Sequence, residues 1–574
     1  MATLAHDAAA RVIARSLRAR GVDRVFALCG GHIMPLWMSL DDEGIAIVDV
    51  RDERAAVYMA HAYGELRGMP GVALVTAGPG VTNAMTGIAN AHVARAPVLV
   101  LSGAPPRPQD NRGALQDLDH VGMLRAITRY ARTVRDAALV PAELDEAFAR
   151  ARGDGGEPGA AYLDFPVDVL RADVPPPLQR AEHLAGRPRA LLAPSPGDVE
   201  RAVELLWSAR RPLVIAGRGV KGRGAPLARF LDALGAVYLD TGESKGVLPA
   251  SHPAFVGAVR GSAMGAADLV VTLGRRLDFQ LAYGSPAVFG DARFVRIADV
   301  AAELRDNRRG DVEILADCGL ALEAIVAAAG GRAAAVDTAW AADLRARHAG
   351  RSARLRESMR VAESAPDGKI HPNRLLACLQ DAIGDDAIVV ADGGDFLAFA
   401  RVGLEAPTWL DPGPLGCIGV GTPFGIGAAL AAPGRSVVVA TGDGAFGFNA
   451  MEIDTAVRHG VPLLIVVANN GAWQIEVNDQ RQSWGRVVGT TLQFADHAAM
   501  ARAFGLHAER VTDAAELPGA LERALAHRPA LVDVVVRGDV MSADGKSGLA
   551  GVPDLMPLTA WDDAERRLRT GGVT

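Results

Sequence analysis

The sequence predicts an α/β protein of three doubly wound parallel-sheet domains, and three observations carry this prediction. Short apolar, β-branched runs alternate with segments of helical spacing along most of the chain. Several runs end in glycine and polar residues, as strands do at the ligand-binding edge of a parallel sheet. The 574 residues are too many for one core. We expect domains over 1–170, 198–327 and 370–537, followed by a C-terminal segment over 538–574.

Composition narrows the functional class. The net charge is −7, and no long basic run supports binding to nucleic acid or to a membrane surface. No apolar run is long enough to span a membrane, and the N-terminus lacks the apolar core of a signal peptide. The cysteines are scattered without a C-x-x-C pair, which is typical of reduced thiols. We therefore expect a cytoplasmic enzyme that acts on a small molecule. The cysteines are Cys29, Cys318, Cys378 and Cys417.

The first domain contains five strand-like runs, and unusual residues follow three of them. His32 follows the first run and is either a structural hydrogen-bonding residue or part of an active site. Glu53 follows the second run and is at least a favourable acid in the first turn of a helix. Residues 76–83 form a glycine turn that enters a helix. The runs are 25–28, 46–50, 72–76, 98–102 and 161–165.

Proline and glycine mark the middle of the chain. Residues 171–197 are rich in proline and predict a linker, because proline interrupts both helices and strand ladders. The strand-like run 212–216 leads into a G-x-G-x-x-G pattern at 217–222, and Asp240 ends the next strand. Taken alone, this pattern favours a dinucleotide site and so a nicotinamide- or flavin-dependent oxidoreductase.

The third domain follows a helical connector at 328–365 and holds the most informative stretch, 436–472. Two apolar runs at 436–440 and 462–468 have the length of buried parallel strands, and residues 451–459 between them have helical spacing. This unit is therefore expected to be a strand, a crossover helix and a second strand.

The polar residues of this unit fall where its strands end. Asp443 follows the first strand and Asn470 the second, so both are expected at the carboxyl edge of neighbouring strands. Asp443 offers a carboxylate oxygen and Asn470 an amide oxygen. Gly444 and Ala445 expose backbone N–H groups at a helix start. These groups suit a divalent cation bridged to a diphosphate.

Residues 442–447, GDGAFG, also satisfy G-x-G-x-x-G, so two other interpretations must be weighed. A dinucleotide site needs an acid about 20 residues later to hold a ribose, whereas the second strand ends in Asn469 and Asn470. Asp443 inside the turn would repel a pyrophosphate unless a metal lay between them. We therefore favour the metal–diphosphate interpretation over a dinucleotide site and over a purely structural turn.

The run GDG, 24 residues and then NN resembles the signature of thiamine diphosphate (ThDP) enzymes. The resemblance is to the superfamily of acetohydroxyacid synthases, benzaldehyde lyase and acyl-CoA lyases. It implies the ThDP-enzyme fold and a Mg²⁺ ion held by Asp443, Asn470 and the backbone oxygen of Ala472. It also implies that the cofactor's diphosphate lies against the turn. The turn residues concerned are Gly442, Asp443, Gly444 and Ala445.

Segments of the first domain carry the same resemblance. RDERAAVYMAHAYG is similar to the superfamily's RHExxAxxMAxGYA segment, although Asp52 replaces the usual histidine. This implies that Glu53 activates the cofactor by protonating its aminopyrimidine ring. Residues 76–83 match TxGPGxTN, where the backbone packs close to the cofactor's ring. Gln116 aligns with a residue that contacts cofactor or substrate, and His32 with a histidine that faces the reacting carbon in benzaldehyde lyase.

In the third domain, the resemblance places cofactor contacts in two further turns. Gly394 and Asp395 follow the expected strand 387–391 and match the place where relatives cover the diphosphate and line the substrate entrance. Ile418 aligns with the bulky residue that wedges between the two cofactor rings and forces them into a V shape.

The middle domain resembles a module that binds FAD in some relatives, ADP in others and nothing in many. Arg276 falls where decarboxylase relatives contact ADP, but Ala298 stands where they place an acid, with Asp299 one position further. ADP in this domain is therefore an open expectation. The other interpretation is that Arg276 pairs with Asp278 or another acid.

As a whole, the resemblance implies a ThDP- and Mg²⁺-dependent enzyme that makes or breaks a C–C bond next to a carbonyl. Acetohydroxyacid synthases carry an FQE-type loop where this chain has LQD at 115–117. His32, RLDFQLAYG and DPGPLGCIGVG look closer to 2-hydroxyacyl-CoA lyases, which cleave 2-hydroxyacyl-CoA reversibly to formyl-CoA and an aldehyde or ketone. The alternatives are a carboligase of the acetolactate synthase or benzaldehyde lyase type that needs no CoA, and a nucleotide-dependent oxidoreductase.

Two structural expectations follow from the same relatives. The segment 538–574 contains apolar residues that a frayed terminus would not need, and acyl-CoA lyases use C-terminal segments as lids over CoA. The substrate is accordingly expected to be an acyl-CoA. Relatives assemble the active site across a subunit interface, so we expect a homodimer or homotetramer.

Overall fold

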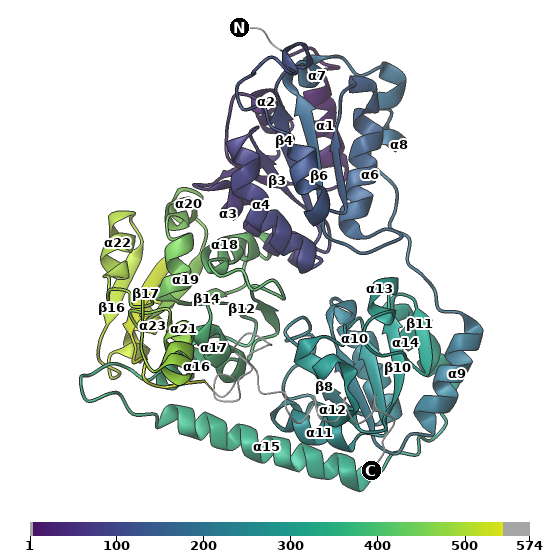
Figure 1. Cartoon of the computed structure of the whole chain (residues 1–574), viewed down its shortest axis with the longest axis vertical. Coiled ribbons are helices and arrows are strands. Elements are labelled where there is room, and N and C mark those ends of the chain that lie inside the picture. The colour runs from purple at the N-terminus through teal and green to yellow at the C-terminus, as the bar shows by residue number, and fades with distance from the viewer. Residues whose placement is uncertain (1–3, 543–574) are drawn as a thin grey trace.

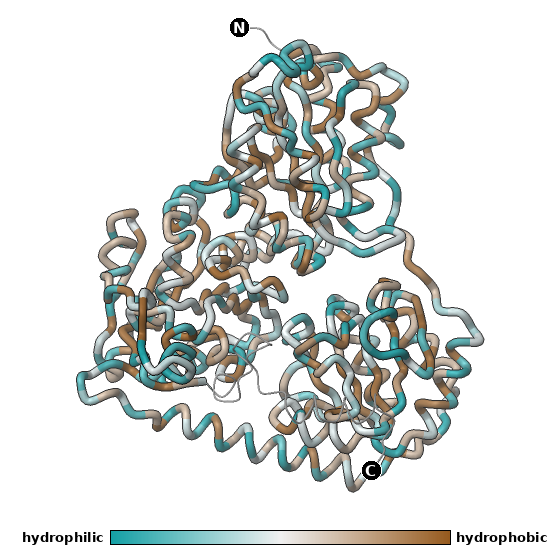
Figure 2. Tube along the Cα trace, in the orientation of Figure 1, coloured by the Kyte–Doolittle hydropathy of each residue, from teal (hydrophilic) through white to brown (hydrophobic). Residues whose placement is uncertain are grey.

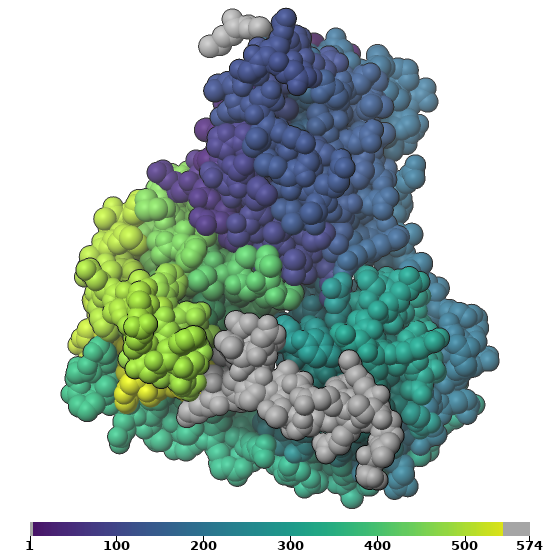
Figure 3. Space-filling view, in the orientation of Figure 1, coloured from purple at the N-terminus to yellow at the C-terminus, as the bar shows by residue number. Residues whose placement is uncertain are grey.

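Three parallel sheets form the computed structural model of the chain, which describes residues 4–542 (Figure 1). The N-terminal lobe rests on the other two lobes, as the space-filling view in Figure 3 also shows. Hydrophobic residues of strands and helices fill the inside of each lobe, and hydrophilic residues are frequent on the outer helices and loops (Figure 2). The predicted architecture of three doubly wound parallel-sheet domains is confirmed.

The N-terminal sheet has the strand order β2-β1-β3-β4-β6-β5. Strand β5 was not among the predicted strands, because it lies at the sheet edge and its residues are only partly buried. The strands are β1 (Arg24–Ala27), β2 (Ala46–Asp49), β3 (Gly71–Val75), β4 (Val98–Ala104), β5 (Tyr130–Thr133) and β6 (Ala160–Pro166). The helices are α1 (Ala9–Ala19), α2 (Met34–Asp42), α3 (Glu53–Arg67), α4 (Pro79–Val93), α5 (His120–Leu124), α6 (Val140–Arg152) and α7 (Val167–Arg171).

The central sheet has the order β11-β10-β9-β7-β8. The predicted proline-rich linker contains a short helix, α8 (Ala181–Leu184), and the predicted connector contains α15 (Thr338–Arg360), which runs along the lower edge of Figure 1. The strands are β7 (Pro212–Ala216), β8 (Val237–Leu239), β9 (Leu269–Leu273), β10 (Arg293–Ala298) and β11 (Val312–Leu315). The helices include α9 (Pro196–Trp207), α10 (Gly224–Leu234), α11 (Arg260–Ala266), α12 (Pro286–Phe289), α13 (Ala301–Leu304) and α14 (Cys318–Ala329).

The C-terminal sheet has the order β13-β12-β14-β15-β17-β16, which repeats the order of the N-terminal sheet strand for strand. The predicted strand–helix–strand unit is present, with two short helices, α19 and α20, between β14 and β15. The strands are β12 (Ile388–Asp392), β13 (Thr408–Leu410), β14 (Val437–Gly442), β15 (Leu463–Asn469), β16 (His507–Val511) and β17 (Ala530–Val535). The helices are α16 (Pro372–Ala382), α17 (Asp395–Gly403), α18 (Gly421–Ala431), α19 (Asp443–Phe448), α20 (Glu452–Arg458), α21 (Gln474–Asp479), α22 (His497–Ala503) and α23 (Leu517–Ala526).

The N-terminal and C-terminal lobes share one hydrophobic core, which is closed by helix α3 against helix α18. The helices approach closely at Gly427, where a Cβ atom would lie 2.4 Å from the backbone oxygen of Met59. Only glycine permits this crossing. The aromatic rings of Tyr58 and His61 pack against Phe424 on either side of it.

Polar contacts hold the start of α3 to the C-terminal lobe. Glu452 is 1% exposed; its Oε1 accepts a hydrogen bond from the backbone N–H of Arg51 at 3.0 Å, and its Oε2 accepts one from the Thr455 hydroxyl at 2.7 Å. Arg458 donates to Asp49 at 2.6 Å beside them. The loop between β2 and α3 is therefore fixed by the second lobe as well as by its own.

Among the residues that the structure describes, no helix is both long enough and apolar enough to cross a membrane. The segment predicted as a lid, 538–574, lies outside the described residues from position 543 onward.

Burial raises the pKa of Glu452 to about 7 from its ordinary 4.5. Between these two values the native carboxyl binds a proton that the unfolded chain does not, so this group favours the native state less as pH rises. Glutamine at position 452 does not titrate. The stability of the Glu452→Gln variant relative to the wild type is therefore expected to increase as the pH rises from 5 to 8. The gain is on the order of 1–3 kcal/mol.

Thermal unfolding of both proteins across this pH range measures the difference. Glu200→Gln serves as the control, because Glu200 is exposed on α9. A difference between wild type and Glu452→Gln that stays constant with pH contradicts the prediction.

Candidate active site

The carboxyl edge of the N-terminal sheet gathers the residues that the sequence singled out in the first domain. We call His32, Glu53, Thr76, Asn83 and Gln116 the N-terminal half-site. The loops that carry them interlock without room for side chains. A Cβ on Gly30 would lie 2.3 Å from Thr76 Cβ, and a Cβ on Gly103 would lie 2.3 Å from the His32 backbone oxygen. The half-site is therefore compact and preorganised.

Glu53 opens helix α3 and is 5% exposed. Asp52 caps the helix by accepting a hydrogen bond from the Arg54 N–H at 2.8 Å, so the departure from histidine at position 52 is explained by a capping role. Glu53 Oε2 accepts a hydrogen bond from Asn83 Nδ2 at 3.0 Å, and its Oε1 faces Gly80, where a Cβ would lie 3.4 Å away. The carboxyl is thus oriented by helix α4.

Two buried polar atoms of this half-site have no hydrogen-bond partner, His32 Nδ1 and Thr76 Oγ1. Buried polar atoms without partners are rare in native proteins, and they suit a place where a polar ligand completes the bonding. Gln116 lies on a loop in a left-handed backbone conformation, φ 61°, and its Cβ sits 2.8 Å from the position of a Cβ on Gly78. These observations fit a polar ring bound at this edge.

The C-terminal half-site occupies the corresponding edge of the third sheet, where β14 and β15 end. We define it as the predicted residues Gly394, Asp395, Ile418, Gly442–Ala445, Asn470 and Ala472. Asp443 is 5% exposed, and burial raises its pKa to about 6. Its Oδ2 accepts the Gly471 N–H at 3.0 Å, and Asn470 Oδ1 accepts the Ala472 N–H at 3.1 Å. A buried carboxylate of this kind favours a bound cation.

The donor set at this edge fits Mg²⁺, which prefers oxygen ligands and binds through one or two carboxylates together with phosphate oxygens. Within residues 4–542, no cluster of three or more His, Cys, Asp or Glu residues could hold a metal ion. The predicted set of one carboxylate, one amide and one backbone oxygen is compatible with that result. Gly444 is required by its surroundings, because a Cβ there would lie 2.6 Å from the Trp473 ring.

Asp392 organises the remaining loops of this half-site. Its buried carboxylate accepts backbone N–H groups from Gly393, Gly419 and Gly421 at 2.7–3.1 Å, and burial raises its pKa to about 6. The half-buried Ile418 lies next to one of these donors, so its loop is tied to the end of β12. Burial raises the pKa of Cys417, in the same loop, and the nearby Tyr58 of α3 lowers it in part.

Asp395 begins helix α17, and burial raises its pKa to about 7. The adjacent Gly394 lies against Ile475, whose Cγ2 would be 3.0 Å from a Cβ. The structure therefore brings the predicted C-terminal residues to one sheet edge, and it brings the predicted N-terminal residues to another. The hydrogen bonds of Glu53 stay within the N-terminal half-site.

The G-x-G-x-x-G turn of the central domain has a different explanation from phosphate binding. A Cβ on Gly219 would lie 2.8 Å from Gly274 Cα, and a Cβ on Gly274 would lie 2.3 Å from Gly219 N. The loops after β7 and β9 thus touch backbone to backbone at the topological switch point of the sheet. These glycines are required by that contact.

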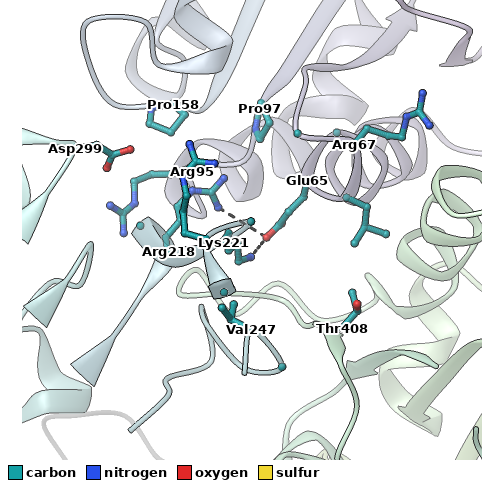
Figure 4. Close-up of a pocket in the computed structure, with 18 of the residues that line it drawn as sticks. Glu65, Arg67, Arg95, Pro97, Pro158, Arg218, Lys221, Val247, Asp299 and Thr408 are labelled. Carbon is teal, nitrogen blue, oxygen red and sulfur yellow. Dashed lines mark ion pairs between the residues drawn. The ribbon is translucent and has the colours of Figure 1, made fainter. Parts of the chain in front are cut away.

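A cavity of about 560 Å³ lies beside this turn, between the three lobes (Figure 4). Cationic side chains outnumber acidic ones in its lining, and some of the cations have acidic partners: Lys221 pairs with Glu65, and Arg95 pairs with Glu243 at 3.1 Å and with Glu303. A nucleotide's phosphates would also meet Asp299 and Glu303, which line the cavity. ADP in the central domain stays a prediction.

Arg276 pairs with Glu157 of the N-terminal lobe at 2.6 Å, while its neighbour Arg275 pairs with Asp278 at 2.9 Å. The interpretation of Arg276 as the partner of another acid is therefore correct. Sequence reasoning missed the long-range contacts of Arg95 and Glu452. No local signal marks them, since each partner lies on a distant segment.

Comparison with known proteins places this geometry in a family. Three family-level descriptions match: the N-terminal thiamine pyrophosphate (TPP, a synonym of ThDP) binding domain of TPP enzymes at residues 7–123, the central domain at 199–325, and the C-terminal TPP binding domain at 393–534. Both half-sites belong to the TPP-binding domains.

Full-length relatives agree with this assignment. The chain is 36% identical over 544 residues to the acetolactate synthase large subunit IlvG of Mycobacterium tuberculosis, covering 92% of this chain and 95% of that protein. It is 32% identical over 574 residues to 2-hydroxyacyl-CoA lyase 2 of Caenorhabditis elegans, with coverage of 92% and 89%. It is 32% identical over 536 residues to the human protein of the same name, with coverage of 86% and 83%. The chain belongs to the thiamine pyrophosphate enzyme family and is a ThDP-dependent enzyme.

Proposed function

We propose that this chain is a Mg²⁺-dependent 2-hydroxyacyl-CoA lyase, which cleaves a 2-hydroxyacyl-CoA reversibly to formyl-CoA and an aldehyde or ketone. The observation that carries the proposal is His32, whose buried Nδ1 has no partner beside Thr76 in the half-site of Glu53. An imidazole there can accept the proton of a substrate hydroxyl. The similarity to 2-hydroxyacyl-CoA lyase 2 proteins supports the choice of substrate.

When bound, ThDP supplies the electron sink for cleavage next to a carbonyl. Asp443, Asn470 and the backbone oxygen of Ala472 would hold Mg²⁺, and the N–H groups at the start of α19 would face the diphosphate. Gly442 ends β14 immediately before Asp443. Gly394 and Asp395 would cover the diphosphate from the end of β12, and Ile418 would support the two rings.

Glu53 would hold a proton at its carboxyl for the ring nitrogen of the aminopyrimidine, and Asn83 keeps that carboxyl in place. Gln116 would contact the reacting group from the loop that packs on Gly78. In this proposal, the C-terminal half-site binds the Mg²⁺ ion and the diphosphate, and the N-terminal half-site transfers protons.

A carboligase of the acetolactate synthase type is the second candidate function. The acetolactate synthase relative shares 36% identity over 92% of this chain, somewhat more than the lyases share. It would use the same half-sites with a 2-oxo acid in place of an acyl-CoA.

We also propose that a second copy of the chain completes each site. Large apolar side chains remain exposed beside both half-sites: Leu115, next to Gln116, is 76% exposed, and Phe448 and Met451, around the end of α19, are 44% and 45% exposed. Exposed apolar residues that cluster around a site are typical of a surface buried on assembly. A homodimer or homotetramer would cover them.

A substrate panel tests the proposed reaction. With ThDP and Mg²⁺, the enzyme is expected to release formyl-CoA from 2-hydroxyacyl-CoAs, and His32→Ala to slow this release by about 10²–10⁴-fold. Chromatography of the CoA products measures both. Acetolactate formed from pyruvate, with no formyl-CoA from any acyl-CoA, would favour the second candidate.

Replacing Glu53 tests the proton transfer. Glu53→Gln keeps the hydrogen bond to Asn83 but removes the acid, so turnover is expected to fall by about 10²–10⁴-fold while ThDP still binds. Steady-state kinetics and calorimetry with ThDP measure the two effects. Glu200→Gln, on the exposed face of α9, is the matched control. Unchanged turnover in Glu53→Gln contradicts the assignment.

Removing the carboxylate of Asp443 tests the metal site. Asp443→Ala leaves the Mg²⁺ ion without its charged protein ligand, so ThDP affinity is expected to fall by at least about 100-fold. Dialysis of the wild type against EDTA should weaken ThDP binding similarly, with recovery on addition of Mg²⁺. If neither Asp443→Ala nor dialysis against EDTA weakens ThDP binding, the proposed metal site is contradicted.

The same two variants test the assembly. When Glu53→Gln and Asp443→Ala chains are co-expressed, a mixed dimer with sites shared between copies contains one intact site, giving about a quarter of wild-type activity. Each variant expressed alone is the control. Activity no higher than that of the single variants contradicts a shared site.

A further inference from the structure

His120 is a buried histidine that none of the roles described above requires. It begins helix α5 and is 2% exposed. Its Nε2 lies 2.8 Å from the backbone nitrogen of Gly78, and its Nδ1 lies 3.0 Å from Asp164 Oδ2. The Gly78 N–H can only donate, so Nε2 carries the lone pair and the ring proton sits on Nδ1, directed at Asp164. The geometry thus defines one neutral tautomer.

Asp164 is a rigid anchor for this ring. It lies on strand β6 and is 3% exposed. The same Oδ2 accepts a hydrogen bond from Tyr162 at 3.2 Å, and the Tyr162 hydroxyl is 2.5 Å from Ser102 Oγ on β4. Two strands of the sheet core therefore fix the carboxylate, and the carboxylate fixes the orientation of the imidazole.

The Gly78 turn, on the other side of the ring, contacts the N-terminal half-site. Gly78 has φ 60° and ψ −111°, a conformation that needs glycine, and it immediately precedes helix α4. From this helix Asn83 donates to Glu53 at 3.0 Å. The Cα of Gly78 lies against Gln116, whose Cβ would be 2.8 Å from an added Cβ. Moving this turn would move the partners of both Glu53 and Gln116.

We propose that His120 is a positioning residue for the reaction: its neutral imidazole, oriented by Asp164, holds the Gly78 turn so that Glu53 and Gln116 keep their places. The inference rests on the proposed function, because it assumes that Glu53 serves the cofactor. His120 itself does not reach a ligand, since its two ring nitrogens are bonded to the protein. A displacement of about 1 Å in such a site can cost about 100-fold in rate.

Two substitutions separate positioning from simple core packing. His120→Leu fills a similar volume but has no acceptor for the Gly78 N–H. His120→Gln offers an amide oxygen near the place of Nε2. We expect kcat to fall about 10–100-fold in the leucine variant with KM little changed, and to recover to within about threefold of the wild type in the glutamine variant. His92→Leu, at the far end of α4, is the matched control.

A second readout does not depend on the substrate. Exchange of the C2 hydrogen of bound ThDP with D₂O, followed by NMR, reports how well Glu53 is placed. It should slow in His120→Leu and recover in His120→Gln. If the leucine variant does not fold, His120→Asn replaces it, because its shorter amide can reach Asp164 but not Gly78.

The outcomes distinguish the inference from the proposed function. The inference is overturned if the C2 hydrogen of ThDP exchanges at the same rate in His120→Gln as in the variant that offers no acceptor to the Gly78 N–H, which is His120→Leu or His120→Asn. If the wild type binds ThDP but releases no formyl-CoA, the proposed substrate is wrong. The C2 exchange experiment still tests the role of His120 in that case, because it needs no substrate. Wild-type protein that takes up no ThDP overturns the proposed function and the inference together.

Discussion

Helix α3 packs against elements of all three lobes, and the arrangement of the molecule depends on that packing. Its first residue is Glu53, its middle turn crosses α18 at the contact of Met59 with Gly427, and Glu65 near its end pairs with Lys221 of the central lobe. Residues 55–64 are all buried, so the helix cannot shift without disturbing several cores. The position of Glu53 is thereby fixed by contacts that lie far from the proposed chemistry.

The candidate site combines acids in surroundings that disfavour their charge. Burial raises the pKa of Asp392 and Asp443 to about 6 and that of Asp395 to about 7. Backbone N–H groups offset part of this cost at Asp392 and Asp443. Acids with raised pKa values are typical of functional sites. The free energy that a bound Mg²⁺ ion contributes is therefore available to order these loops.

Sequence patterns predicted the parts of the fold and of the site that are local. The buried strands could be read from short β-branched runs, and Asp443 and Asn470 follow such runs directly. Four edge strands, β5, β11, β13 and β16, were not predicted, because they are short or have mixed burial and so lack a clear pattern. The G-x-G-x-x-G turn at Gly217 is ambiguous in sequence, because contact between two loops also requires its glycines.

Sequence patterns could not predict contacts between residues that lie far apart in the chain. His120 meets Asp164 across 44 positions, and Arg51 meets Glu452 across 401. No spacing rule links such pairs, since only the closed fold brings their strands and helices together. The same holds for Arg95, which pairs with acids of the central lobe from a left-handed backbone position, φ 57°.

The repeated strand order of the first and third sheets has a consequence for stoichiometry. Each chain carries one half-site of each kind, on two sheets of the same topology. If the N-terminal half-site of one copy meets the C-terminal half-site of another, a two-fold axis between the copies forms this contact twice and closes the assembly. A symmetry operation that does not close would instead repeat the contact along a filament. A closed pair then contains two identical pockets and binds one cofactor per chain.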